Sequence, residues 1–224
     1  MIDSYQHQWQ DGEPIEHACS KIVCVGKNYA DHIKEMNSAT PAQPVLFIKP
    51  PSALCDANAP IKISHLEHLG ALHHELEISL LIGDEHSKNY FDTVVPIAGI
   101  GVGLDLTLRD IQTQLKTQGL PWERAKSFDG SCVLSAFTKI DDSIQLDKIS
   151  LELSVNDSLR QKSDSSYMLC AIPYLLQEIN SVFTLLPGDV VLTGTPAGVG
   201  PLYRGDIISA KLNGHSMILK STVI

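Results

Sequence analysis

The spacing of hydrophobic and polar residues predicts a strand-rich chain with few helices. Short apolar or β-branched runs bounded by glycine or proline predict strands over 21–26 and 44–50. The run over 75–83 alternates at its start and ends in a Gly-Asp turn, as half-buried strands do. Residues 99–106 are nearly all apolar, which is typical of a strand covered on both faces. Further short strands, separated by Gly-Asp and Asn-Gly turns, are expected over 187–224.

Three stretches carry helical patterns instead. Asn28 is the expected N-cap of a short helix over 28–36, and Thr107 is that of a helix that stops at Gly119. A third helix is expected over 172–183, where apolar residues recur at helical spacing. Because so few helices cannot cover a doubly wound sheet, we expect an α+β, β-rich fold, a mixed and mostly antiparallel β-roll with peripheral short helices.

Length and composition narrow the class of protein. A chain of 224 residues that is 43% hydrophobic can bury one sizeable core, so we expect a single catalytic domain over 1–224. The formal charge of -9, and 17 basic residues without a run, argue against a nucleic-acid partner. The five cysteines include no CxxC pair, and no segment has the pattern of a leader or a membrane span. We therefore expect a cytoplasmic protein with reduced thiols and no membrane partner.

Three acidic residues are the first candidates for chemistry. Glu75 and Glu77 lie two apart on a strand and project from one face, although a solvated face would explain that pair alone. Asp105 lies in an apolar run, where an ionised carboxylate needs a cationic partner. That partner is either a metal ion or a basic side chain such as Arg109. If it is a metal, three oxygen donors without Cys or His favour Mg²⁺ or Mn²⁺.

A second group of residues suits proton transfer. His32 and Glu35 lie three apart on the short helix, so a carboxylate can orient an imidazole that acts as a general base. An ordinary surface pair is the alternative, and the helix could also be a mobile lid. Lys126 could stabilise negative charge on an enolate oxygen, or form a plain salt bridge.

Two further segments offer groups that could bind a substrate. Arg109 and Gln112 follow Asp105 closely and could orient a small acid. The glycine-rich segment 192–200 turns tightly, and its backbone N–H groups and the Thr195 hydroxyl could receive a carboxylate. A purely structural hairpin is equally compatible with that segment.

Several separated motifs occur here in an order that resembles the fumarylacetoacetate hydrolase family. They are GKNYADHIKEM, FIKP, HHELEISLLIG, GLDLTLRDIQ, GLPWERAKSFDGSC and LTGTPAGVG. The resemblance covers about residues 21–223, which form the family-like core after an N-terminal segment 1–20, and it looks nearest to the short acylpyruvase branch. It implies a β-rich mixed roll, usually a homodimer.

The resemblance also implies roles for the candidate residues. Mg²⁺ or Mn²⁺ would bind at Glu75, Glu77 and Asp105. His32 and Glu35 would form a water-activating dyad on a lid, and the remaining positions would contact the substrate or the transition state: Lys126, Arg109, Gln112 and Thr195.

The resulting expectation is hydrolysis of a small 2,4-dioxo acid. An acylpyruvate such as acetylpyruvate or fumarylpyruvate would be cleaved at a carbon–carbon bond to pyruvate and a carboxylic acid. Decarboxylation or tautomerisation of oxaloacetate is the main alternative, since it needs the same enolate without an attacking water. An isomerase of an aromatic-catabolism diacid and a non-enzymatic binding module are further alternatives.

Overall fold

The computed structural model describes residues 5–63, 66–89, 91, 93–213 and 219–224. Its α-helices are α1 (Ala30–Glu35), α2 (Arg109–Gln118), α3 (Glu123–Lys126) and α4 (Ile172–Val182), with 3₁₀ turns η1 (Pro51–Ala53), η2 (Glu67–Leu69) and η3 (Ser165–Tyr167). Its strands are β1 (Ile22–Gly26), β2 (Val45–Lys49), β3 (Leu54–Asp56), β4 (Leu72–His74), β5 (Leu76–Ile82), β6 (Ile97–Asp105), β7 (Thr107–Leu108), β8 (Cys132–Leu134), β9 (Thr138–Lys139), β10 (Ser150–Val155), β11 (Ser158–Asp164), β12 (Val190–Leu192), β13 (Gly200–Pro201), β14 (Ile207–Leu212) and β15 (Leu219–Thr222).

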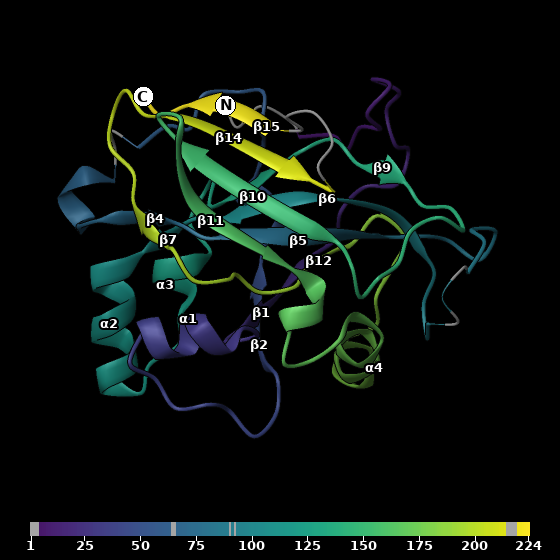
Figure 1. Cartoon of the computed structure of the whole chain (residues 1–224), viewed down its shortest axis with the longest axis horizontal. Helices are drawn as coiled ribbons and strands as arrows, with labels where there is room; N and C mark the ends of the chain where they lie inside the picture. The colour runs from purple at the N-terminus through teal and green to yellow at the C-terminus, as the bar shows by residue number, and fades with distance from the viewer. Residues whose placement is uncertain (1–4, 64–65, 90, 92, 214–218) are drawn as a thin grey trace.

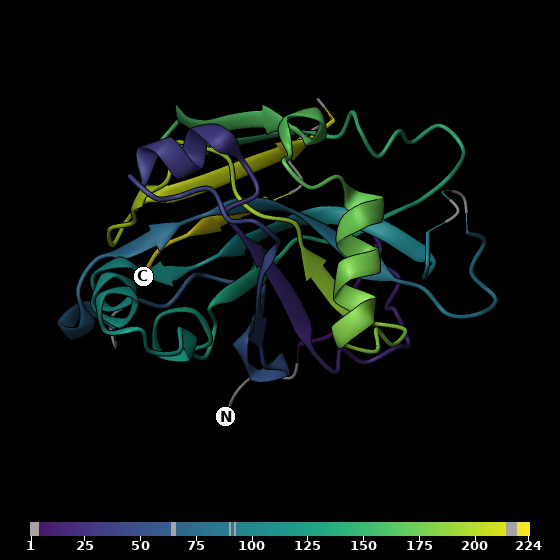
Figure 2. The same cartoon turned by 90° about the horizontal axis from the view of Figure 1, so that it is seen from below.

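Three sheets form the framework. The largest has the order β2-β1-β12-β5-β6-β8-β3, with β9 added beside β6. A four-stranded sheet, β11-β10-β14-β15, lies over it, with β10 against β5 and β14 against β6, and the small sheet β13-β4-β7 lies beside them (Figures 1 and 2). Most pairs are antiparallel, while β1 with β12 and β3 with β8 are parallel. The expected mixed, β-rich α+β fold is therefore confirmed.

The main hydrophobic core lies between the two larger sheets. Strand β5 is buried along its whole length, as a strand covered on both faces must be. Apolar side chains of β6, β10, β14 and α4 belong to the same buried cluster. Helix α4 contributes one apolar stripe to it, which is why its sequence has helical periodicity: Ile172, Leu175, Leu176 and Ile179.

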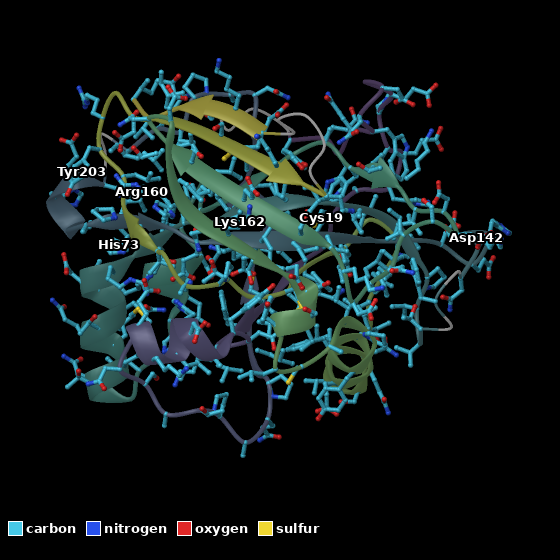
Figure 3. All side chains as sticks on the ribbon, viewed as in Figure 1. Cys19, His73, Asp142, Arg160, Lys162 and Tyr203 are labelled. Atoms are coloured by element: carbon cyan, nitrogen blue, oxygen red, sulfur yellow. The ribbon has the colours of Figure 1, made fainter. Side chains whose placement is uncertain are left out.

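The three other helices gather at one end of the molecule. Asp142 and Tyr203 mark opposite ends of the long axis in Figure 3, and α1, α2 and α3 lie toward the Tyr203 end in Figure 1. Within the described residues, no helix combines the length and the apolar character that crossing a membrane requires. The expected homodimer is not tested by the structure of a single chain and stays a prediction.

Both expected helix N-caps were wrong. Helix α1 begins after Tyr29, and the Asn28 amide instead donates to the Thr193 carbonyl at 2.8 Å while its oxygen accepts from the Cys170 N–H at 2.8 Å. Helix α2 begins after Leu108, because Thr107 lies in β7. In both cases a long-range contact takes the polar side chain that the local pattern assigned to the helix end.

The other boundaries follow the sequence closely. Gly119 ends α2 in the left-handed conformation, with φ of 66°. Strands β12 to β15 occupy the C-terminal stretch as expected, although the predicted Asn-Gly turn at 213–214 lies partly outside the described residues. The expected strand over 75–83 is β5, and Glu75 lies in the break between β4 and β5.

Candidate active site

The three acidic residues converge where β5 and β6 lie side by side. Glu77 belongs to β5, and Asp105 is the last residue of its antiparallel partner β6. The Asp105 N–H donates to the Glu75 carbonyl at 2.9 Å. One carboxylate oxygen of each residue lies within 4.8 Å of the others. The side chains are buried, with exposed fractions of 4%, 1% and 1% for Glu75, Glu77 and Asp105. A solvated strand face is therefore excluded.

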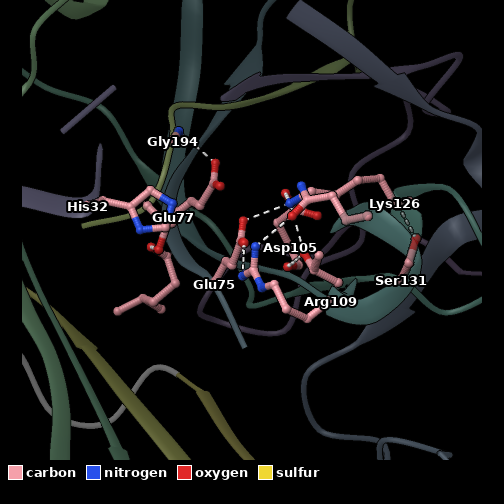
Figure 4. Close-up of polar contacts among 12 residues, drawn as sticks. His32, Glu75, Glu77, Asp105, Arg109, Lys126, Ser131 and Gly194 are labelled. Atoms are coloured by element: carbon pink, nitrogen blue, oxygen red, sulfur yellow. Dashed lines mark hydrogen bonds and ion pairs between the residues drawn. The ribbon is translucent and has the colours of Figure 1, made fainter. Parts of the chain in front are cut away.

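Two basic side chains reach this cluster from α2 and α3 (Figure 4). The Lys126 ammonium lies 2.5 Å from Asp105 Oδ2 and 2.7 Å from Glu75 Oε2, and it donates to the Thr107 hydroxyl at 2.8 Å. Arg109 Nη2 lies 2.5 Å from Glu75 Oε1, and its Nη1 donates to Gln112 Oε1 at 2.6 Å. Arg109 thus pairs with Glu75 and not with Asp105.

A third basic residue, Lys49, was missed by the sequence reasoning. It ends β2 with no exposed surface, and its ammonium lies 2.9 Å from Asp105 Oδ1. It also donates to the Ser131 carbonyl and hydroxyl, at 3.0 Å each, and to the Lys126 carbonyl. A lysine inside the apolar run of FIKP was the available signal, because a buried ammonium needs anionic or carbonyl partners.

Glu77 differs from the other two acids in its partners. Its Oε2 accepts a hydrogen bond from the Gly194 N–H at 2.6 Å, and no basic side chain among the described residues forms an ion pair with it. Burial and the neighbouring Asp105 and Glu75 raise the pKa of Glu77 well above its usual value. Burial also opposes ionisation of Glu75, but Lys126 and Arg109 outweigh it and hold the pKa of Glu75 well below its ordinary value.

This donor set fits a divalent cation. Glu77 is a buried carboxyl beside two carboxylates and has no ion-pair partner among the described residues, so a doubly charged ion would supply one and displace the proton of Glu77. Each carboxylate oxygen has two lone pairs, so the oxygens that contact Lys126 and Lys49 can still coordinate. The donors are hard oxygens without thiolate or imidazole, which suits Mg²⁺ or Mn²⁺.

His32 and Glu35 form the expected pair, and it is not an ordinary surface pair. His32 Nδ1 lies 3.1 Å from Glu35 Oε2, and His32 is only 7% exposed. The other carboxylate oxygen of Glu35 accepts the Gly198 N–H at 3.0 Å, so the helix is tied to the 192–200 segment. Gly198 has φ of 99°, and a Cβ there would collide with the Arg160 carbonyl, which explains the glycine.

The 192–200 segment packs against the site residues and holds them through hydrogen bonds. The Gly194 N–H is used by Glu77, and the Thr195 hydroxyl donates to the Leu76 carbonyl at 2.8 Å while accepting from Gln161 at 2.8 Å. In this arrangement the hydroxyl proton points toward Leu76 and not toward a ligand. That Thr195 binds a substrate carboxylate stays a prediction.

A single pocket brings the candidates together. Apart from Glu35, which lies behind His32, all the predicted site residues line it: His32, Glu75, Glu77, Asp105, Arg109, Gln112, Lys126 and Thr195. The sequence reasoning missed its aromatic wall of Phe47 and Trp122 and two outer cations, Lys27 and Lys116. Lys27, Phe47 and Trp122 lie within the family motifs quoted above, which was the available signal, whereas Lys116 lies outside those motifs.

Comparison with known proteins identifies relatives over nearly the whole chain. The family model described as fumarylacetoacetate (FAA) hydrolase C-terminal matches residues 21–224. Oxaloacetate tautomerase YcgM of Escherichia coli is 47% identical over 95% of this chain and 97% of its own. The human mitochondrial oxaloacetate tautomerase FAHD1 is 42% identical over 86% and 87%, and the mitochondrial oxaloacetate decarboxylase of Dictyostelium discoideum is 39% identical over 91% and 94%.

Solved structures agree in fold. A fumarylacetoacetate hydrolase family protein from Yersinia pestis has a TM-score of 0.90 at 42% identity, covering 98% of this chain and 100% of its own. Fumarylpyruvate hydrolase from Pseudomonas aeruginosa, in complex with Mn²⁺ and pyruvate, has a TM-score of 0.87 at 27% identity, covering 99% and 96%.

These relatives correct the expected activity. The expectation of acylpyruvate hydrolysis is wrong, because the curated relatives at 39–47% identity are named for oxaloacetate tautomerisation or decarboxylation. The fumarylpyruvate hydrolase shares the fold but only 27% of its residues with this chain. The family itself is established by the model match and by relatives that align almost end to end, and the chain belongs to the fumarylacetoacetate hydrolase family of enzymes.

Proposed function

We propose that this protein is an oxaloacetate tautomerase, which interconverts the enol and keto forms of oxaloacetate. The observation that carries the proposal is a buried, oriented imidazole, His32, that lines one pocket with a carboxylate cluster and the fixed ammonium of Lys126. The names of relatives at 47% and 42% identity support the choice of substrate.

The reaction moves one proton and leaves the atom count unchanged. In the enol-to-keto direction the C2 hydroxyl loses its proton, the C2–O bond becomes a double bond, and the electron pair of the C2–C3 double bond forms a new C3–H bond. Because Nδ1 of His32 contacts Glu35, Nε2 is left to give or take the proton at C3. Glu35 is itself held by the Gly198 N–H, so it orients the imidazole.

Lys126 acts through its charge. Burial opposes its ionisation, but Asp105 and Glu75 outweigh that effect and raise the pKa of Lys126 well above its ordinary value. The residue therefore stays an ammonium throughout the reaction and stabilises negative charge on the oxygen at C2 without transferring a proton. Arg109 and Gln112, joined at 2.6 Å, lie along the same wall and position the acid.

Glu75, Glu77 and Asp105 would hold the metal ion, Mg²⁺ or alternatively Mn²⁺. A divalent ion held there would supply a Lewis acid that stabilises negative charge on the oxygen of the 2-oxo group. The Pseudomonas aeruginosa relative, in complex with Mn²⁺ and pyruvate, supports a 2-oxo acid and a divalent ion as partners.

The test measures loss of the ultraviolet absorbance of enol-oxaloacetate with protein supplied with Mg²⁺. We expect the wild type to accelerate this loss, and His32→Asn to lower kcat by about 100- to 10,000-fold, the usual contribution of a general acid or base. His86→Asn, at an exposed histidine with a side chain 84% accessible, is the matched control and should behave as wild type. A wild type that does not accelerate ketonisation, or a His32→Asn enzyme as active as His86→Asn, would refute the proposal.

Decarboxylation of oxaloacetate is the second candidate, favoured by the Dictyostelium discoideum relative of that name. It breaks the C3–C4 bond, releases C4 as CO₂ and leaves the enolate of pyruvate, which becomes pyruvate when C3 takes up a proton, so no proton is taken from C3 beforehand. Pyruvate is measured in parallel by coupling to lactate dehydrogenase. Pyruvate formation faster than ketonisation would assign the second function in place of the first.

A further inference from the structure

The outer part of the pocket carries positive charge that the chemistry so far does not use. At the inner end, the Lys126, Arg109 and Lys49 cations are each paired with a carboxylate of Glu75 or Asp105. Lys116 also lines the pocket, but within the described parts of the chain its ammonium has an aromatic neighbour and no carboxylate ion-pair partner.

Lys116 extends the substrate-facing side of α2 outward. Arg109, Gln112 and Lys116 are separated by three and four residues, which places them along one face of the helix. Seven residues correspond to about 10 Å along the helix axis, so Arg109 lies at the deep end of this face and Lys116 at its outer end. Arg109 contacts Glu75, whereas Lys116 is an exposed residue open to a ligand that enters from solvent.

An aromatic wall joins the two ends. The Lys126 ammonium lies 5.3 Å from the centre of the Phe47 ring, and the Lys116 ammonium lies 5.2 Å from that of Trp122. The Phe47 and Trp122 ring centres are 5.9 Å apart. Two cations therefore lie against one continuous apolar surface, an arrangement that suits a short carbon chain with an acidic group at each end.

The surroundings of Lys116 favour an anion. Although the residue is exposed overall, partial desolvation of its ammonium and the nearby Arg109 guanidinium lower the pKa of Lys116 to about 8. Lys126 and Lys27 act in the same direction, whereas Glu75 opposes them. A bound carboxylate would relieve this repulsion between cations.

We propose that Lys116, seated on Trp122 at the outer end of the α2 face, binds the substrate carboxylate remote from the 2-oxo group and so selects dicarboxylates over monocarboxylates. The inference rests on the proposed function, because it assumes that the 2-oxo end of the substrate lies at the inner cluster. It assigns Lys116 a binding role and no part in the proton transfer.

Binding of unreactive analogues tests this inference apart from catalysis. Malate and lactate are 2-hydroxy acids that differ in the second carboxylate, and their affinities for protein supplied with Mg²⁺ are measured by calorimetry. We expect the wild type to prefer malate, and Lys116→Met to weaken malate binding about 10- to 100-fold, the effect of removing a hydrogen bond to a charged group. Lactate binding should stay unchanged, and Lys116→Arg should keep most of the preference.

Lys148→Met, at an exposed lysine outside the pocket, is the control for loss of a surface charge and should match the wild type. Equal weakening of malate and lactate by Lys116→Met, or an unchanged malate preference, would overturn the inference. A Lys116-dependent malate preference in a protein without tautomerase activity would support this carboxylate site while refuting the proposed function. Tautomerase activity with no such preference would refute the inference alone.

Discussion

Replacement of Lys49 by methionine tests how the acidic cluster is held together. The change keeps an unbranched side chain but removes a fully buried ammonium that lies 2.9 Å from Asp105 Oδ1. The Ser131 carbonyl and hydroxyl lose their 3.0 Å hydrogen bonds to Lys49 at the same time. Asp105 keeps Lys126 at 2.5 Å, so the site loses one of the two cations that neutralise this carboxylate.

The expected loss of stability follows from removing one partner of a buried ion pair while the other partner keeps its charge. An uncompensated buried charge costs about 3–5 kcal/mol, so we expect the free energy of unfolding of the metal-free protein to fall by about that amount. For a domain whose whole stability is about 5–15 kcal/mol, this is a large fraction. A saturating divalent ion should restore part of the loss, because it gives Asp105 a second positive neighbour and binds the native state selectively.

Urea unfolding in the presence of EDTA, and again with saturating Mg²⁺, measures both effects. The double variant Lys49→Met/Asp105→Asn removes the charge together with its partner and should be more stable than Lys49→Met alone. Lys148→Met is the surface control and should shift the free energy of unfolding by less than about 0.5 kcal/mol. A metal-free Lys49→Met protein within about 1 kcal/mol of the wild type would refute the reasoning, because the buried pair would then carry little of the stability.

Three further predictions follow from single contacts. The pKa of Glu77 is raised in the metal-free fold, so the stabilisation linked to its bound proton is present at low pH and is lost as pH rises through that pKa. The increase in Tm caused by Mg²⁺ should therefore grow with pH. An increase in Tm that does not depend on pH would contradict this prediction. Gly194→Ala should destabilise the protein by about 1–3 kcal/mol in urea, since φ is 98° and a Cβ would lie 2.7 Å from that of Asn28; unchanged stability would show that the turn relaxes freely. Asn28→Ala should cost about 1–3 kcal/mol in thermal or urea unfolding, because the Thr193 carbonyl and the Cys170 N–H lose their partner, whereas Asn58→Ala at an exposed site serves as the control.

The local pattern of the chain was sufficient for the long central strands, the C-terminal strands and three of the helices, but it did not identify β10 and β11. The apolar run over 99–106 is β6 within two residues, and the helical stripe over 172–183 is α4 within one. The same reasoning found the acidic cluster, because an aspartate in an apolar run requires a partner and two glutamates two apart share a face. Each of these inferences uses residues close together in sequence, where periodicity and burial are encoded locally.

The substrate could not be identified from local sequence patterns. The motif order was enough for the family, since several separated segments agreed, but relatives of one fold differ in the acid that they act on. Acylpyruvate hydrolysis and oxaloacetate chemistry would both use the acidic cluster and His32, so the residues that local patterns identify do not distinguish the two reactions.

The strand-rich class, the main helices and the acids that need a cation can thus be inferred from the amino-acid sequence alone. The partners of those residues are known only from the folded structure: Lys49 and Lys126 lie beside Asp105, Arg109 pairs with Glu75, and the Gly198 N–H donates to Glu35. Asn28 and Thr107 were misassigned for the same reason, because distant groups bind side chains that local rules place at helix ends. Glu35 and Gly198 are 163 positions apart, and contacts of that range depend on strand register and packing, which no local period contains.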